Sequence, residues 1–232
     1  MNQGLVLILF QVFVLILAFT VHECAHAWTA WRLGDPTARM LGRITLNPLK
    51  HLDPFGSVIF PLIGLVYGGM LFGWAKPTPV TARNFKNYRR DDILVSLAGP
   101  ISNLLMASTA LILLLIMKHS VGGGFAAIQA ARLLAHRVPI ATENLPPLFP
   151  VALFLYYVIF LNLLLFVFNL IPVPPLDGSH ILRHFLPYNV LQVYDRIGMF
   201  GLLIIMLLAG GFIFRVFLYP LQSAFDSILM SL

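Results

Sequence analysis

Long apolar segments without charged residues limit how this chain can fold more than any other feature of its sequence. Four of them cover residues 4–21, 93–117, 151–171 and 197–214. Each is close in length to the roughly 20 residues with which a helix crosses the hydrocarbon core of a bilayer. With 59% of 232 residues hydrophobic and only 10% charged, a soluble domain could not bury the apolar surface. The sequence therefore predicts an all-α integral membrane protein, a polytopic helix bundle of about four to six membrane segments.

A fifth apolar stretch, residues 55–73, is short for a span and is interrupted by Pro61, Gly64 and the Gly68-Gly69 pair. The loops on both of its sides are basic, and the positive-inside rule places basic loops in the cytoplasm. We therefore expect a re-entrant segment with both ends cytoplasmic, which puts the N-terminus outside; a fully spanning fifth helix is the alternative. The basic residues expected inside are Arg32, Arg39, Arg43, Lys50, Lys76, Arg83, Lys86, Arg89, Arg90, Arg183 and Arg196. The net charge of +6 then reflects membrane topology, and no nucleic-acid partner is expected.

Two segments that flank this stretch have the pattern of extended backbone. Residues 38–47 partly alternate between polar and apolar side chains. Residues 74–81 carry prolines two positions apart, which a strand tolerates only at the edge of a sheet. We expect the two segments to form a small β-sheet or hairpin near the cytoplasmic face.

The sequence "HECAH" stands where the first apolar segment reaches its expected inner end. His22 and His26 are four residues apart, so on a helix they share one face and can bind one metal ion. Zinc suits neutral imidazole ligands and lowers the pKa of its bound water, and Glu23 is placed to accept the proton of that water. Ionisable side chains at membrane depth are costly and usually functional. The motif therefore predicts a zinc site, with Glu23 beside it and placed to polarise the metal-bound water.

A catalytic zinc needs a third protein ligand, and Asp177 in "FNLIPVPPLDGSH" is the candidate. The three prolines of this segment break the helix near the inner membrane face, where irregular backbone is tolerated if it lines a cavity. His22 reaches the same depth in the expected topology. The other interpretation of Asp177 is an ordinary Asp-Gly turn.

Three motifs, "HECAH", "AGPISN" (98–103) and "NLIPVPPLDG" (169–178), resemble the signatures of the site-2 protease family of intramembrane zinc metalloproteases. The segments "NPLKHLDPFG" (47–56) and "GWAKPTPV" (73–80) are similar to the compact bacterial branch that has no PDZ or CBS domain. The resemblance covers about residues 20 to 185. It implies that His22, His26 and Asp177 bind one zinc ion per chain, and that Glu23 is the catalytic base.

The same resemblance indicates the substrates and the location of the protein. Family members cut transmembrane segments of other proteins near the cytoplasmic face. We therefore expect residues 1–232 to form a single membrane-embedded peptidase domain with several membrane passes. The expected location is a bacterial inner or plasma membrane, with the active site toward the cytoplasm.

Three further polar residues, His51, Asn103 and Asn169, are candidates for holding the substrate or stabilising an oxyanion, because the resemblance places them in or near the active-site surroundings. His51 could instead be a surface histidine beside Asp53. Asn169 could bond helix to helix, as could Asn162, seven residues earlier on the same helix face. His180 and His184 are also four residues apart, but no glutamate accompanies them, and we interpret them as solvated interfacial histidines.

Two other functions compete with cleavage of transmembrane substrates. One is a membrane zinc protease that cuts lipidated or misfolded proteins from a cytosolic chamber. Such sites usually take a glutamate as third ligand, and Glu143, the only other glutamate besides Glu23, lies on the expected outer side. The other is a non-catalytic transporter or scaffold with structural polar residues, which would contain no zinc.

Overall fold

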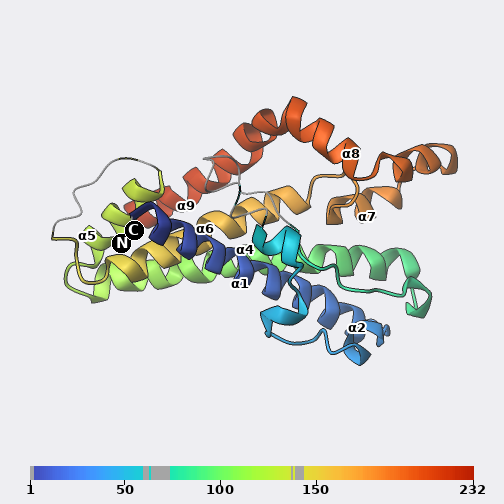
Figure 1. The fold of residues 1–232 in the computed structure, drawn as a ribbon, viewed down its shortest axis with the longest axis horizontal. Coiled ribbons are helices and arrows are strands. Elements are labelled where there is room, and N and C mark those ends of the chain that lie inside the picture. The colour runs from blue at the N-terminus through green and yellow to red at the C-terminus, as the bar shows by residue number, and fades with distance from the viewer. Residues whose placement is uncertain (1–2, 60–62, 64–73, 137, 139–143) are drawn as a thin grey trace.

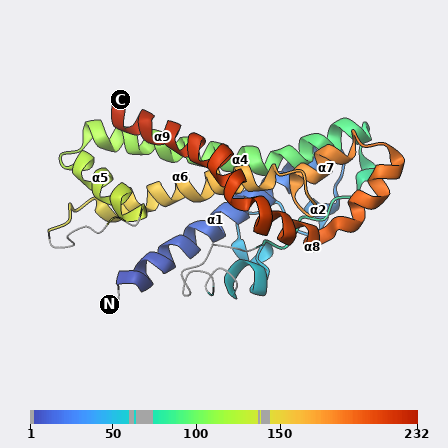
Figure 2. The same cartoon turned by 90° about the horizontal axis from the view of Figure 1, so that it is seen from above.

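Three long helices form the body of the fold. The computed structural model describes residues 3–59, 63, 74–136, 138 and 144–232. The long helices are α1 (Gln3–Arg32), α4 (Tyr88–Ser120) and α6 (Phe149–Asn169). They run along the length of the molecule in Figures 1 and 2, and α4 packs against both α1 and α6. Val14, Leu114 and Leu161, one from each helix, are fully buried in a single hydrophobic cluster.

The other elements of the described chain precede, connect or follow these three helices. They are α2 (Thr37–Met40), η1 (Pro48–Lys50), η2 (Pro54–Ile59), η3 (Ala82–Asn84), α5 (Gly124–Ala135), α7 (Asp177–Arg183), α8 (Tyr188–Ile213), η4 (Phe214–Leu218) and α9 (Tyr219–Ser231). Helix α5 and the C-terminal end of α9 lie at one end of the molecule, and α2 and α7 lie toward the other (Figure 1). Helix α8 is kinked at Gly198, whose φ of 53° is a conformation that glycine adopts readily.

Four helical stretches of the described residues are long and apolar enough to cross a membrane. They are Leu7–Arg32, Tyr88–Ser120, Phe149–Asn169 and Gly201–Ser231. Leu207 and Leu208 of the last stretch are 85% and 80% exposed, which fits contact with lipid. The prediction of a polytopic helical membrane protein is confirmed. The last stretch is longer than predicted because η4 and α9 continue it to Ser231.

The prediction of a small β-sheet or hairpin is wrong, because the part of the chain that the structure describes contains no strand. Residues 38–47 begin in α2 and continue as turns. Residues 74–81 form no regular secondary structure, and Pro77 and Pro79 have no N–H group to give to a neighbouring strand. Three of the other donors bond elsewhere: Lys76 N to His51 O, Thr78 N to Glu23 Oε2 and Thr81 N to Asp35 Oδ2. Loops and side chains therefore take the place of a strand partner.

The predicted re-entrant segment, residues 55–73, lies mostly outside the described residues. Its two ends meet, since Trp74 N donates to Gly56 O at 3.1 Å and Ser57 Oγ donates to Trp74 O at 2.7 Å. The chain therefore enters and leaves this segment at one place. Re-entry from the cytoplasm stays a prediction.

A proline-rich turn after α6 brings the short helix α7 back onto α4. Gly178 makes the turn compact, because a side chain there would overlap the carbonyl of Leu170. At the other end of α7, His184 Nε2 lies 2.7 Å from Asp92 Oδ2 on the first turns of α4. These contacts hold the first residue of α7, Asp177, above α1.

Candidate active site

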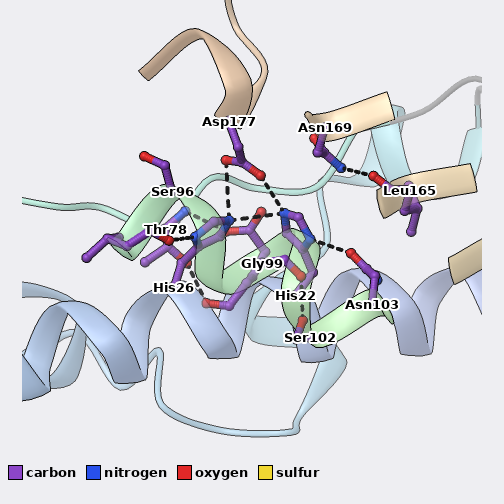
Figure 3. Close-up of polar contacts among 12 residues, drawn as sticks. His22, His26, Thr78, Ser96, Gly99, Ser102, Asn103, Leu165, Asn169 and Asp177 are labelled. Carbon is purple, nitrogen blue, oxygen red and sulfur yellow. Dashed lines mark hydrogen bonds and ion pairs between the residues drawn. The ribbon is translucent and has the colours of Figure 1, made fainter. Parts of the chain in front are cut away.

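His22 and His26 lie on one face of α1, toward α4 and α7 (Figure 3). Their side chains are one helical turn apart, and their Nε2 atoms approach to 3.0 Å. Both residues are buried, with 5% and 7% of their surface exposed. Two polar rings are therefore brought together inside the bundle, at a place where an unpaired polar group is costly.

The outer ring nitrogen of each histidine is fixed by a hydrogen-bond acceptor. His26 Nδ1 lies 2.7 Å from the carbonyl oxygen of Val95, and His22 Nδ1 lies 2.6 Å from Asn103 Oδ1. A carbonyl oxygen can only accept, so each Nδ1 carries the proton. In the neutral rings the two facing Nε2 atoms then carry lone pairs.

Asp177 completes a group of three, which we call the His–His–Asp cluster. Its Oδ2 lies 3.2 Å from His22 Nε2 and its Oδ1 lies 3.4 Å from His26 Nε2, and Figure 3 shows the carboxylate pointing at both rings from α7. Burial raises the pKa of Asp177, but the charge and the N–H groups of the two imidazoles, when these are protonated, outweigh this effect and leave the pKa well below its usual range. Asp177 is therefore an anion at neutral pH.

This cluster has the donor set and the size of a zinc site. Its three ligand atoms lie within 4.8 Å of one another, and no other such group occurs among the described residues. Donor atoms on a tetrahedral zinc are about 3.3 Å apart, as follows from bond lengths near 2.0–2.1 Å. Asp177 Oδ2 is buried and lacks a hydrogen-bond partner among the described residues. A cation bound here would satisfy the two facing lone pairs and the buried carboxylate oxygen that has no donor.

Glu23 lies beside the cluster and is held by a residue that sequence reasoning missed, Thr78. The Thr78 N–H donates to Glu23 Oε2 at 2.8 Å, and the Thr78 hydroxyl donates to the Glu23 carbonyl at 3.0 Å. Pro77 and Pro79 on either side have no N–H group, so Thr78 is an isolated backbone donor. That isolated N–H is the only signal in the sequence that could have pointed to this contact.

Gly99 of the "AGPISN" motif lies against both histidines, which explains why the motif accompanies "HECAH". A methyl group built on Gly99 would overlap His26 Nε2 and His22 Cε1. No other residue type fits this position of α4 without displacing the rings.

The three candidates for substrate binding have different surroundings. Asn103 is fully buried behind His22, where its Nδ2 donates to Asn162 Oδ1 at 2.8 Å. Asn169 lines the cavity above the cluster and donates to Leu165 O at 3.0 Å. His51 is fully buried, with Nε2 2.9 Å from Thr45 O, and is not among the residues that line this cavity. The structure therefore brings only Asn169 of the three to the cavity.

His180 and His184 do not form a second metal pair. His180 is exposed and lines the cavity, whereas His184 pairs with Asp92. Tyr88 covers the ring of His184 edge-on at 5.1 Å between ring centroids. The interpretation of His184 as a solvated histidine is therefore incomplete, since it is a docking residue of α7.

A cavity of ≈ 540 Å³ opens over the cluster. Its lining includes the polar residues of the cluster and Glu23. It also includes apolar residues from α1, α4, α6, α8 and the segment 74–81: Phe19, Trp74, Val80, Val95, Leu165, Phe168 and Leu202. The site can therefore hold an apolar stretch of chain next to a buried polar centre.

The chain that carries the His–His–Asp cluster, Glu23 and this cavity matches a known protein family. The family model described as peptidase family M50 matches residues 10–209. The chain belongs to peptidase family M50. The match includes all four residues of the predicted zinc chemistry, which agrees with the resemblance to the site-2 protease family.

Several bacterial members of the family are similar to this chain. A candidate zinc metalloprotease of Bacillus subtilis (strain 168), YwhC, is 38% identical over 221 residues, which cover 95% of this chain and 89% of that protein. A candidate zinc metalloprotease of Mycobacterium tuberculosis (strain ATCC 25618 / H37Rv), Rip2, is 31% identical over 175 residues, which cover 72% of this chain and 55% of that protein. No solved structure matches this chain.

Proposed function

We propose that this M50 protein is an intramembrane zinc metalloprotease that hydrolyses peptide bonds in or near transmembrane segments of other proteins. The observation that carries the proposal is the convergence of His22, His26 and Asp177 within 4.8 Å, beside Glu23 and beneath an apolar cavity. Membership of the family and the four membrane-crossing helices support the reaction class and the setting. His22, His26 and Asp177 hold the metal, and Asn169 is a candidate substrate contact.

The chemistry divides between the metal and Glu23. A zinc ion held by these residues would polarise the scissile carbonyl and lower the pKa of a water molecule. Glu23 would accept the proton of this water and later deliver it to the leaving amine. Thr78 occupies Glu23 Oε2, so Oε1 is the oxygen left for the proton. Holding one oxygen of the base in this way fixes the direction of the other.

The apolar lining of the cavity favours a membrane-embedded substrate over a soluble one. A helical substrate hides its peptide bonds, so it must unwind locally before hydrolysis. Arg32 at the end of α1 and Arg39 and Arg43 in the segment after it follow His26 closely in the chain, and the positive-inside rule therefore supports a site near the cytoplasmic face of a bacterial plasma membrane.

The rival functions receive less support. A transporter or scaffold that used these polar residues only structurally would have no use for two lone-pair nitrogens facing a carboxylate. A chamber protease that takes a glutamate as third ligand would need Glu143, which lies outside the described residues, whereas the carboxylate that meets the histidines is Asp177. Neither relatives nor family match favour these alternatives.

The test separates metal binding from proton transfer. Glu23→Gln keeps the size of the side chain and removes its basicity, so the purified variant should retain about one zinc per chain. Cleavage of a reporter transmembrane helix in detergent should fall by at least about a hundredfold, the scale of a lost general base. Cys24→Ser, which changes the next residue of α1, is the control and should leave both zinc and cleavage unchanged. Loss of zinc from Glu23→Gln, or cleavage at the wild-type rate, would refute the assigned role.

A further inference from the structure

A line of buried amides leads from α6 to the first histidine of the cluster. Asn162 on α6 and Asn103 on α4 are both fully buried. Asn162 Oδ1 accepts from Asn103 Nδ2 at 2.8 Å, and Asn103 Oδ1 lies 2.6 Å from His22 Nδ1. None of these amide atoms reaches the cavity, so a direct contact with substrate does not explain them.

The direction of this line is set at its far end by the backbone. Asn162 Nδ2 donates to the carbonyl oxygen of Val158 at 2.8 Å, and a carbonyl can only accept. Asn162 must therefore turn its own oxygen toward Asn103. Asn103 must then turn its nitrogen toward Asn162, which leaves its oxygen for His22.

We propose that Asn162 is a positioning residue for metal binding, which acts through Asn103 to keep the proton of His22 on Nδ1 and its lone pair on Nε2. The inference rests on the proposed zinc role of His22. His26 needs no such line, because Val95 O binds its Nδ1 directly at 2.7 Å. Both rings are thus oriented by a backbone carbonyl, one directly and one through two amides.

Without Asn162 the amide of Asn103 has no reason to keep this orientation. A flipped Asn103 would present its nitrogen to His22 Nδ1, which would then accept a hydrogen bond. The ring proton would move to Nε2, and the lone pair that faces His26 and Asp177 would be lost. Mutation of a residue that hydrogen-bonds a metal-bound histidine typically lowers metal affinity by about 10–100-fold.

The experiment measures zinc affinity of the purified full chain by competition with a chromophoric chelator. Asn162→Leu keeps the approximate volume and removes both hydrogen bonds, so affinity should fall at least about tenfold. Asn162→Ser is the second variant, in case leucine prevents folding. Its hydroxyl can still bond Val158 O but is too short to reach Asn103, so the same loss is expected.

A second background separates orientation from packing. In Asn103→Asp the carboxylate can only accept from His22 Nδ1, whatever Asn162 does. Adding Asn162→Leu to this variant should therefore change zinc affinity by less than about threefold. Thr20→Val is the control and should bind zinc as the wild type does, because it removes a buried hydroxyl whose hydrogen-bond partner in the described part of the chain is the Ile16 carbonyl of its own helix.

The outcomes are distinguishable. An Asn162→Leu variant with unchanged zinc affinity would overturn the inference. An equal loss of affinity in the wild-type and the Asn103→Asp backgrounds would also overturn it, because that result would indicate a packing role for Asn162. A wild-type protein that binds no zinc would instead refute the proposed function itself. Loss in the wild-type background that Asn103→Asp abolishes would establish the positioning role.

Discussion

The histidine side and the aspartate side of the His–His–Asp cluster are held in different ways. His22 and His26 sit in the middle of a long packed helix, and buried acceptors on α4 fix their Nδ1 atoms. Asp177 begins the short helix α7, which follows a proline-rich turn and whose far end is held by the His184–Asp92 contact. The comparison indicates that a rigid pair of rings is preorganised, whereas the carboxylate depends on how α7 docks.

The largest effect should come from removing a ring. His22→Ala deletes one of the two proposed nitrogen ligands and leaves Asn103 Oδ1 without its partner. Zinc in the purified protein should fall from about one per chain to near zero, because a catalytic site has only three protein ligands. Metal analysis after dialysis is the measurement. Asp177→Asn keeps a neutral oxygen in place and should retain more zinc than His22→Ala, although with weaker affinity. The reverse order would show that the aspartate side, not the histidine side, holds the metal.

Gly99 offers a way to disturb the histidine side without touching a ligand. Gly99→Ala places a methyl group against both rings, so zinc affinity should fall by about tenfold or more, as for other displaced ligands. Gly211→Ala in α8 is the matched control, because nothing lies within 4 Å of the added carbon there. That substitution should leave affinity unchanged and slightly stabilise its helix. Equal affinities for the two variants would mean that the rings are not tightly packed against α4.

What the sequence predicted correctly depends on local patterns. The uncharged runs predicted the four spans, and the spacing of His22 and His26 predicted a shared helix face. The contacts it could not predict join residues far apart in the chain, such as Thr78 with Glu23, which are separated by 55 positions.

The small β-sheet was predicted from the alternation and prolines of two extended segments, a pattern that shows backbone shape but not where each N–H group bonds. Residues 74–81 form no regular secondary structure, and the N–H groups of Lys76, Thr78 and Thr81 go to a loop carbonyl and to side chains. In the same way, the sequence around an asparagine in an apolar helix does not reveal whether the side chain joins two helices or orients a metal ligand. Asn162 does the former in the structure and the latter only in our proposal.

The aspartate side can be loosened at a distance through His184. His184→Gln weakens the contact with Asp92 that docks α7 on α4, while Asp177 itself stays unchanged. We expect zinc affinity to fall by about fivefold, less than the 10–100-fold typical of direct partners of a ligand. The control is Arg183→Gln, since the neighbouring Arg183–Asp195 ion pair is exposed and contributes little. If His184→Gln lowered zinc affinity as much as Gly99→Ala does, the histidines and Asp177 would be held equally rigidly, and the proposed difference between them would be refuted.

The smallest effect on zinc is expected at Asp35, which organises the segment that reaches Glu23 rather than the cluster. Asp35 is fully buried just after α1, and its carboxylate accepts from Thr37 N, Thr81 N and Asn84 Nδ2. Asp35→Asn should leave zinc affinity unchanged but lower the free energy of unfolding by about 1–3 kcal/mol, because the new amide places a donor against donors. Thermal unfolding in detergent measures this effect.

Low pH should destabilise the wild-type protein for the same reason that Asp35→Asn does, because it removes the charge of Asp35. Burial raises the pKa of Asp35, but the hydrogen bonds from Thr37, Thr81 and Asn84 outweigh it and leave the pKa below its usual range. A lowered folded-state pKa means that the carboxylate stabilises the fold fully above its unfolded pKa of about 4, and that this stabilisation is lost as the pH falls through the lower folded value. The wild-type melting temperature should therefore fall more steeply than that of Asp35→Asn as the pH is lowered below about 4. Asp195→Asn, which changes an exposed carboxylate, should keep the wild-type slope. Parallel slopes for wild type and Asp35→Asn would show that the network around Asp35 does not depend on its charge.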